Sequence, residues 1–139
     1  MEVLRPKAMG ISEKCSQICA VVSFITLIFY CFYGVIYDYF DTVVCFSFVL
    51  GMLCAEIYAV VPKKWTSFLN LLSVISLSFG IGLFFLNSYP VWADRLNNIE
   101  MYGSRGTLVP VVAIILLTFV CILIEIVSCF TLNRRWRKP

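Results

Sequence analysis

The chain has 139 residues, of which 61% are hydrophobic and only 14% are charged, with eleven basic side chains against eight acidic ones and no histidine. Soluble domains contain about 45–50% apolar residues, so this composition excludes an ordinary soluble globule and indicates a membrane protein. The absence of histidine excludes histidine-based acid–base catalysis and histidine-ligated metals.

Four apolar segments are each long enough to cross a bilayer, which takes about 20 residues. We predict spanning helices over residues 18–37, 42–61, 65–86 and 109–132. Because these spans nearly exhaust the chain, we expect one all-α domain over residues 1–139, an integral membrane four-helix bundle. The first apolar segment is too long for the core of a cleavable signal peptide, so we expect it to remain as an anchor.

The last predicted span carries an acid, Glu125, inside an apolar sequence. Polar or small side chains lie at helical spacing around this acid, at positions i−7, i−4, i+3 and i+4, and these are Thr118, Cys121, Ser128 and Cys129. Such spacing places them in one stripe along one face of the helix. We predict that this stripe turns inward, toward the other helices.

The first three predicted spans also have polar or small faces. In the first span, side chains of this kind follow one another at helical spacing: Cys19, Ser23, Thr26, Tyr30, Tyr33 and Tyr37. In the second span, small residues recur every four positions, at Ser47, Gly51, Ala55 and Ala59, a pattern that lets another backbone approach closely. The third span has Ser73, Ser76 and Gly80 on one face and Ser78 and Gly82 nearly opposite, which predicts packing on both sides.

The second span holds a further acid, Glu56, which lies about 9–12 Å from the same end of the bundle as Glu125. One hypothesis is a proton- or cation-coupling site made of Glu56, Glu125, Thr118 and Ser128. A second hypothesis is a buried polar seam, in which neutral acids bond to neighbouring helices because an ionised carboxylate is costly in hydrocarbon. A third is that a partner subunit supplies a basic residue.

Residues 87–108 form the only long connection between predicted spans. Ser88 and Pro90 predict the start of a short amphipathic helix and Gly103 its stop, and we expect this helix to lie at the membrane surface. Local salt bridges are one expectation for the charges in this connection, and a docking surface for a partner or ligand is the other. The docking residues would be Trp92, Asp94, Arg95, Glu100, Tyr102 and Arg105.

Basic residues are concentrated on one side of the predicted bundle. Nine of the eleven lie in the two tails or in the connection between the second and third spans, namely Arg5, Lys7, Lys14, Lys63, Lys64, Arg134, Arg135, Arg137 and Lys138. By the positive-inside rule, both termini are predicted to be cytoplasmic and the 87–108 connection to lie on the opposite side.

The sequence contains no nucleotide-binding loop, metal cluster, catalytic triad or nucleic-acid-binding pattern, so we expect neither a cofactor nor enzyme activity. The leading hypothesis is an accessory or scaffold subunit of a membrane complex, whose partners are the lipid bilayer and a membrane protein or a second copy. The alternative is a small proton- or cation-coupled transporter that uses Glu56 and Glu125. Four helices form a narrow pathway at best, so that alternative requires an oligomer.

Overall fold

The computed structural model describes residues 10–61 and 64–131, and all regular elements in these two stretches are helices. The elements are α1 (Ile11–Tyr37), α2 (Thr42–Val60), a 3-10 turn η1 (Lys64–Thr66), α3 (Ser67–Asn87), α4 (Tyr89–Asn97) and α5 (Leu108–Phe130). The four long helices are each long and apolar enough to cross a membrane. The predicted all-helical bundle with four candidate spans is therefore confirmed, as expected of a multi-pass membrane protein.

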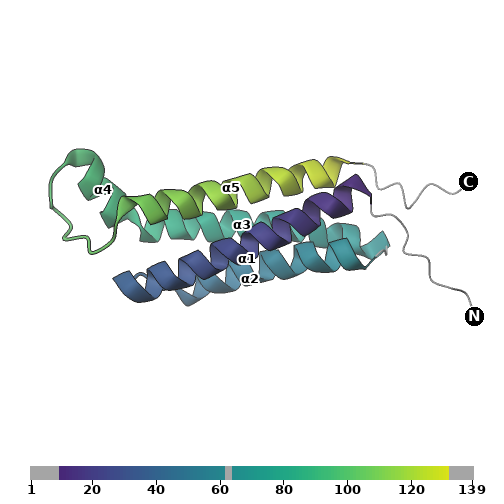
Figure 1. Ribbon diagram of the computed structural model, residues 1–139, viewed down its shortest axis with the longest axis horizontal. Coiled ribbons are helices and arrows are strands. Elements are labelled where there is room, and N and C mark those ends of the chain that lie inside the picture. Colours follow the sequence, from purple (N-terminus) through teal and green to yellow (C-terminus); the bar gives the residue numbers. More distant parts are fainter. Residues whose placement is uncertain (1–9, 62–63, 132–139) are drawn as a thin grey trace, which may run out of the picture.

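The four long helices lie side by side along one direction (Figure 1). Helix α2 packs extensively against α1 and α3, and α5 also packs against α1 and α3, so that each helix has two main neighbours in a ring. The start of α1 and the end of α5 lie at one end of the bundle, and α4 lies at the other (Figure 1). We call these the inner end and the outer end.

The largest difference from the predicted boundaries is at the start of α1, which begins at Ile11 rather than at residue 18. The backbone N–H of Gly10 donates to the carboxylate of Glu13 at 2.8 Å and closes the first turn. Ser12 and Ser16, which follow the same spacing as the predicted polar stripe, are buried. The polar residues that precede the apolar run thus belong to the helix.

The turn between α1 and α2 is held by two acids at the outer end. Asp38 adopts the left-handed conformation (φ 63°) that closes α1. Asp41 caps α2 by accepting hydrogen bonds from the N–H of Val43 and from the side-chain amide of Asn87, both at 2.7 Å. These two bonds lower the pKa of Asp41, because they favour its charged form. The hydroxyl of Tyr30 also bonds to the backbone of Asp41, at 2.8 and 3.0 Å, so the turn is tied to α1 and α3.

The small-residue ladder of α2 faces inward, as predicted, and lets α3 approach closely. Its members Ser47, Gly51, Ala55 and Ala59 are all buried. A Cβ atom on Gly51 would lie 2.7 Å from Cγ of Leu77 in α3, and Ser73 of α3 donates to the carbonyl of Gly51 at 2.8 Å. On α3 itself, only one of the two predicted small faces is packed, because Ser78 and Gly82 are exposed.

Aromatic side chains fill the outer half of the bundle. Tyr30 of α1 contacts Phe48 of α2 and Phe84 of α3, with ring centroids 5.6 and 5.5 Å apart in edge-to-face arrangements. All three side chains are almost fully buried. Such pairs contribute specific stabilisation beyond the apolar area that they bury. The largest cluster of bonded polar side chains lies at the other end of the bundle, the inner end.

Candidate functional site

Six polar side chains from all four long helices meet near the inner end. They are Ser12 and Ser16 of α1, Tyr58 of α2, Asn70 of α3, and Glu125 and Ser128 of α5, and we call them the inner polar cluster. Each of them is buried. A polar group in an apolar interior must be hydrogen-bonded to avoid a large desolvation cost, so the bonds within this cluster decide what it can do.

Glu125 lies at the centre of the cluster with none of its surface exposed. The hydroxyl of Ser16 donates to one of its carboxylate oxygens, Oε2, at 2.9 Å. The side-chain amide of Asn70 reaches the other oxygen, Oε1, at 2.7 Å. Helices α1, α3 and α5 are thus joined through one carboxyl group.

The amide of Asn70 is hydrogen-bonded at both ends when its nitrogen faces Glu125. The nitrogen then donates to Oε1 of Glu125 at 2.7 Å, while the oxygen accepts from Ser128 Oγ at 3.1 Å and from the N–H of Cys129 at 3.3 Å. Through this amide, α3 is joined to both Glu125 and Ser128 of α5.

Ser128 links the cluster to the first turn of α1. Its hydroxyl lies 2.9 Å from Ser12 Oγ, 3.0 Å from Ser16 Oγ and 2.9 Å from the carbonyl of Ser12. The hydroxyl of Ser12 lies a further 2.7 Å from that of Tyr58 on α2. This chain of hydroxyl groups fastens α1, α2 and α5 together at the inner end.

Thr118 is buried on the same stripe as Glu125, as predicted, but it does not join the cluster. Its hydroxyl donates to the carbonyl of Ile114 in its own helix at 2.8 Å. It borders a small hollow together with Ser23, Thr26, Phe48 and Leu77, and this hollow has ≈ 0 Å³ available to a water molecule. Cys121 is also buried, whereas Cys129, the last member of the predicted stripe, is exposed.

Glu56 was predicted to share a site with Glu125, and the structure does not bring the two together. Glu56 is exposed on α2, whereas Glu125 is fully buried. The reason is helix geometry, because Ala55 in the inward ladder precedes Glu56 by one residue, which is a rotation of about 100° around the axis. Of the four residues in the predicted coupling site, only Glu125 and Ser128 therefore lie in the inner polar cluster.

Asp94 organises the connection at the outer end. Its carboxylate accepts from the backbone N–H groups of Met101 (3.2 Å), Tyr102 (2.9 Å) and Ser104 (3.2 Å), and only 7% of the residue is exposed. Burial by itself would raise the pKa of Asp94, but the hydrogen bonds from Tyr102, Ser104 and Met101 outweigh that effect and lower it. One buried acid thus fixes the fold of the loop that follows α4.

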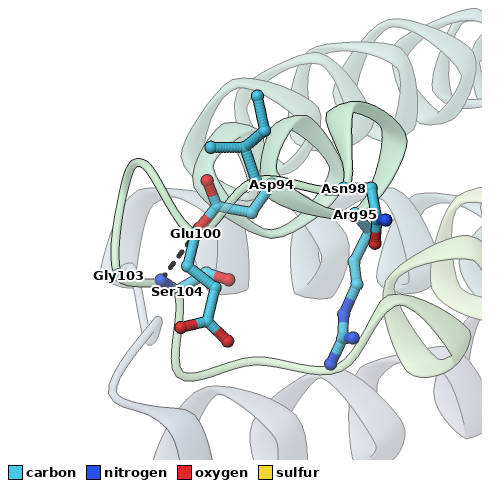
Figure 2. Close-up of a pocket in the computed structure, with 7 residues that line it drawn as sticks. Asp94, Arg95, Asn98, Glu100, Gly103 and Ser104 are labelled. Carbon is cyan, nitrogen blue, oxygen red and sulfur yellow. Dashed lines mark hydrogen bonds between the residues drawn. The ribbon is translucent and has the colours of Figure 1, made fainter.

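The other charges of this connection form no ion pair with any residue that the structure describes. Within the described part of the chain, no salt bridge joins Asp94 or Glu100 to Arg95 or Arg105, so the expectation of local ion pairs was wrong. Arg95 and Glu100 lie instead on opposite sides of an open pocket of ≈ 400 Å³ (Figure 2). Asn98 and Gly103 also line this pocket. Asp94 forms no ion pair with Arg95 or Arg105 because backbone N–H groups already occupy its carboxylate oxygens.

The remaining predicted docking residues differ in how freely they are presented. Trp92 packs on Phe85 of α3 with ring centroids 4.9 Å apart, and its indole N–H donates to the carbonyl of Phe85 at 3.2 Å. Tyr102 is half exposed and contacts Tyr89, whereas Arg105 is exposed. The connection also packs closely against the bundle at Gly106, where any Cβ atom would clash with the hydroxyl of Tyr33.

Four members of the site were not predicted from the sequence: Ser12, Ser16, Tyr58 and Asn70. The two serines had a detectable signal, because they extend the spacing of Cys19 and Ser23 toward the N-terminus by two further turns. Tyr58 had no such signal in the sequence, since its spacing does not distinguish it from a tyrosine at the membrane interface. Within residues 10–61 and 64–131, no group of three or more cysteine, aspartate or glutamate side chains could hold a metal ion.

Comparisons of the chain with protein-family models, with curated proteins and with solved structures find no match.

Proposed function

We propose that this chain is a non-enzymatic multi-pass membrane protein that serves as an accessory or scaffold subunit of a larger membrane complex. The observation that carries the proposal is the inner polar cluster. Its six side chains bond to one another across α1, α2, α3 and α5, so the buried polar groups serve to hold the helices together. The groups left for other molecules are on the outside, in the outer connection and on the outward helix faces.

The outer connection supports a docking role because it is shaped by the chain itself. Asp94 holds three backbone N–H groups, and Gly106 packs against the bundle, so the loop needs no partner to adopt its form. Arg95 and Glu100 are exposed beside the open pocket, and neither is paired with another residue in stretches 10–61 and 64–131. A pre-organised loop with free charges loses little entropy on binding, which favours association.

The proposed orientation places both termini in the cytoplasm. It rests on the excess of basic residues in the tails and in the connection between α2 and α3. The start of α1 and the end of α5 lie at the same end of the bundle, which agrees with two termini on one side (Figure 1). Helix α4 would then lie at the opposite membrane surface, where Trp92 and Tyr89 suit the interfacial layer. Most of the basic residues, including Lys63 and Arg134, lie outside the described residues.

A proton- or cation-coupled transporter is the second candidate, because Glu125 is a fully buried carboxyl group among polar side chains of three helices. Two observations give it less support. Glu56 lies outside the bundle, and the hollow beside Thr118 has no volume for a water molecule. If Glu125→Gln abolishes proton release during cation flux in proteoliposomes, while the wild-type chain alone sustains that flux, the transporter function is correct.

The test of the subunit role is purification of the tagged chain from its native membrane in a mild detergent. We expect a second integral membrane protein at a fixed stoichiometric ratio, and a loss of that protein when Arg95→Glu reverses a charge in the outer connection. Asp38→Asn, at the outer end but outside this connection, serves as the control and should retain it. A chain that purifies without any other protein under these conditions would contradict the proposal.

A further inference from the structure

Two opposite charges stand on the outward surface of the bundle, Lys14 on α1 and Glu56 on α2. Both side chains are exposed, and neither forms a hydrogen bond or an ion pair with another residue in the described stretches 10–61 and 64–131. Lys14 is also the one basic residue within α1, α2, α3 and α5. An unpaired carboxylate among apolar side chains on a spanning helix is costly, so Glu56 needs a partner.

The two charges lie at nearly the same depth. The hydroxyls of Ser12 and Tyr58 meet at 2.7 Å, which sets the register between α1 and α2 at the inner end. Since the helices run in opposite directions, Lys14 lies two residues outward from Ser12, and Glu56 lies two residues outward from Tyr58. Each step is about 3 Å along the helix axis, so a plane parallel to the membrane passes close to both charges.

Both charges can reach one face, formed by α1 and α2, because Lys14 points outward from α1 and has a long side chain. Lys14 lies on the same line of α1 as Phe32, five turns away, and Phe32 borders an apolar groove of ≈ 400 Å³ that runs along this helix. Cys31 in the same groove interacts with Cys45 of α2. Glu56 lies three turns beyond Cys45 on that side of α2. The face therefore combines an apolar groove toward the outer end with two unpaired charges toward the inner end.

We propose that a second copy of this chain docks on the α1–α2 face, with Lys14 of each copy facing Glu56 of the other. A two-fold axis along the membrane normal keeps every residue at its own depth, so charges at one depth can meet across it. The resulting interface is self-complementary, since α1 packs against α2 of the other copy twice. Each copy then supplies the cation that its neighbour's Glu56 lacks, and the exposed Phe32 and Val35 pack in the outer half.

This inference is separate from the subunit role, because self-association and binding of a different protein can each occur without the other. The two opposite charges allow the proposed dimer to be tested by reversing one charge in each of two variants. Glu56→Lys makes a copy with two cations at the interface, and Lys14→Glu makes a copy with two anions. Each variant should fail to pair with itself, but a mixture of the two should form a hetero-pair with two ion pairs.

The experiment measures energy transfer between copies labelled with donor and acceptor dyes in liposomes over a range of protein-to-lipid ratios. We expect the wild-type chain to associate, each single variant to associate at least about tenfold more weakly, and the mixture to return to within about threefold of wild type. Leu71→Lys, on the exposed face of α3 and near the depth of Asn70, is the control and should leave association unchanged. Circular dichroism of each variant verifies that the helices are formed.

Three results would overturn the proposal: a wild-type chain that stays monomeric, a mixture that associates no better than its components, or an equal loss with Leu71→Lys. A monomeric chain that still purifies with a different membrane protein would reject the second copy and retain the subunit role. Self-association rescued in the mixture, with no other protein in the purified complex, would retain the second copy and reject the subunit role.

Discussion

The region around Glu125 and the region around Glu56 lie within about one helical turn of each other in depth, and each contains one glutamate. Inside the bundle, Glu125 is bonded by Ser16 and Asn70 and has no exposed surface. Outside it, Glu56 is exposed among apolar side chains and has no bonded neighbour in the described part of the chain. A buried glutamate can therefore join the helices of a membrane bundle when its own chain supplies hydrogen-bond donors. A glutamate without such donors needs a partner from another molecule.

The largest expected effect is at Glu125. Glu125→Leu keeps a side chain of similar size but leaves Ser16 and Asn70 without their shared acceptor, so we expect the free energy of unfolding to fall by about 2 kcal/mol. Glu125→Gln can bond to both neighbours and should stay within about 1 kcal/mol of wild type. Unfolding in mixed detergent micelles, followed by circular dichroism, measures both values. Equal losses in the two variants would mean that shape rather than hydrogen bonding is what Glu125 provides.

A second pair of matched residues extends the contrast between inward and outward positions. Gly51→Val forces methyl groups toward Leu77, whose Cγ would lie 2.7 Å from the new Cβ, and overpacking of this kind costs about 1–3 kcal/mol. Gly82→Val is made on the exposed face of α3, where no atom lies within 4 Å of the new Cβ. We expect this control to unfold like the wild type in the same assay. Similar destabilisation by both would show that helix propensity, not packing, sets the outcome.

A third acid, Asp94, is bonded by backbone N–H donors, whereas Glu125 is bonded by side-chain donors. In Asp94→Asn the amide oxygen can keep the bonds to Met101 and Tyr102, but the amide nitrogen faces the N–H of Ser104. Hydrogen exchange of the Ser104 amide should therefore quicken by about tenfold, while the helices are unaffected. Glu100→Gln, in the same connection but without such bonds, is the control and should leave exchange unchanged.

The same loop should respond to pH in a defined direction. The pKa of Asp94 is lowered from its ordinary value of 3.8, so the folded loop favours the ionised carboxylate. The stabilisation is therefore fully present above pH 3.8 and is lost as the pH falls through the lower pKa of the folded loop. Exchange of the Tyr102 and Ser104 amides, corrected for intrinsic rates, should rise only in that acid range. A rise already near neutral pH would contradict the assignment of Asp94 as the anchor.

The smallest expected effect is at Glu56 in the isolated, dilute chain. Glu56→Leu removes an exposed acid that has no bond to lose, so the free energy of unfolding should change by less than about 0.5 kcal/mol. Together with the loss in Glu125→Leu, this result would show that the buried acid contributes to the free energy of unfolding and the exposed acid does not. A large loss in Glu56→Leu would mean that Glu56 interacts within its own chain after all.

The inward-facing helix faces were predictable from spacing alone, although Glu125 and Ser128 were the only members of the inner polar cluster predicted as site residues. The stripe through Thr118, Glu125 and Ser128 was assigned inward, and all three residues are buried. The ladder through Gly51 and Ala55 was also assigned to a close helix contact, and it is one. Periodicity is reliable here because a spanning helix keeps its geometry over its whole length, so residues on one line stay on one line.

Other parts of the site could not be predicted in this way. Asp94 carried the same sequence signal as Glu100, yet only Asp94 is turned toward the loop backbone. Likewise, the depth of Glu56 was correctly placed near that of Glu125, but depth says nothing about rotation around the helix axis. Which charge is bonded and which is free depends on the neighbours that the folded loop and bundle supply.

The sequence by itself determined that four helices of this chain can cross a membrane and that each has a small or polar face. Hydrophobic length and helical spacing are local properties, and in lipid the backbone must satisfy its own hydrogen bonds, so the local signal is strong. Only the tertiary structure decided that Glu56 lies outside the bundle, apart from Glu125. That choice depends on how each helix is rotated against its neighbours, and close packing of small residues such as Gly51 sets the rotation.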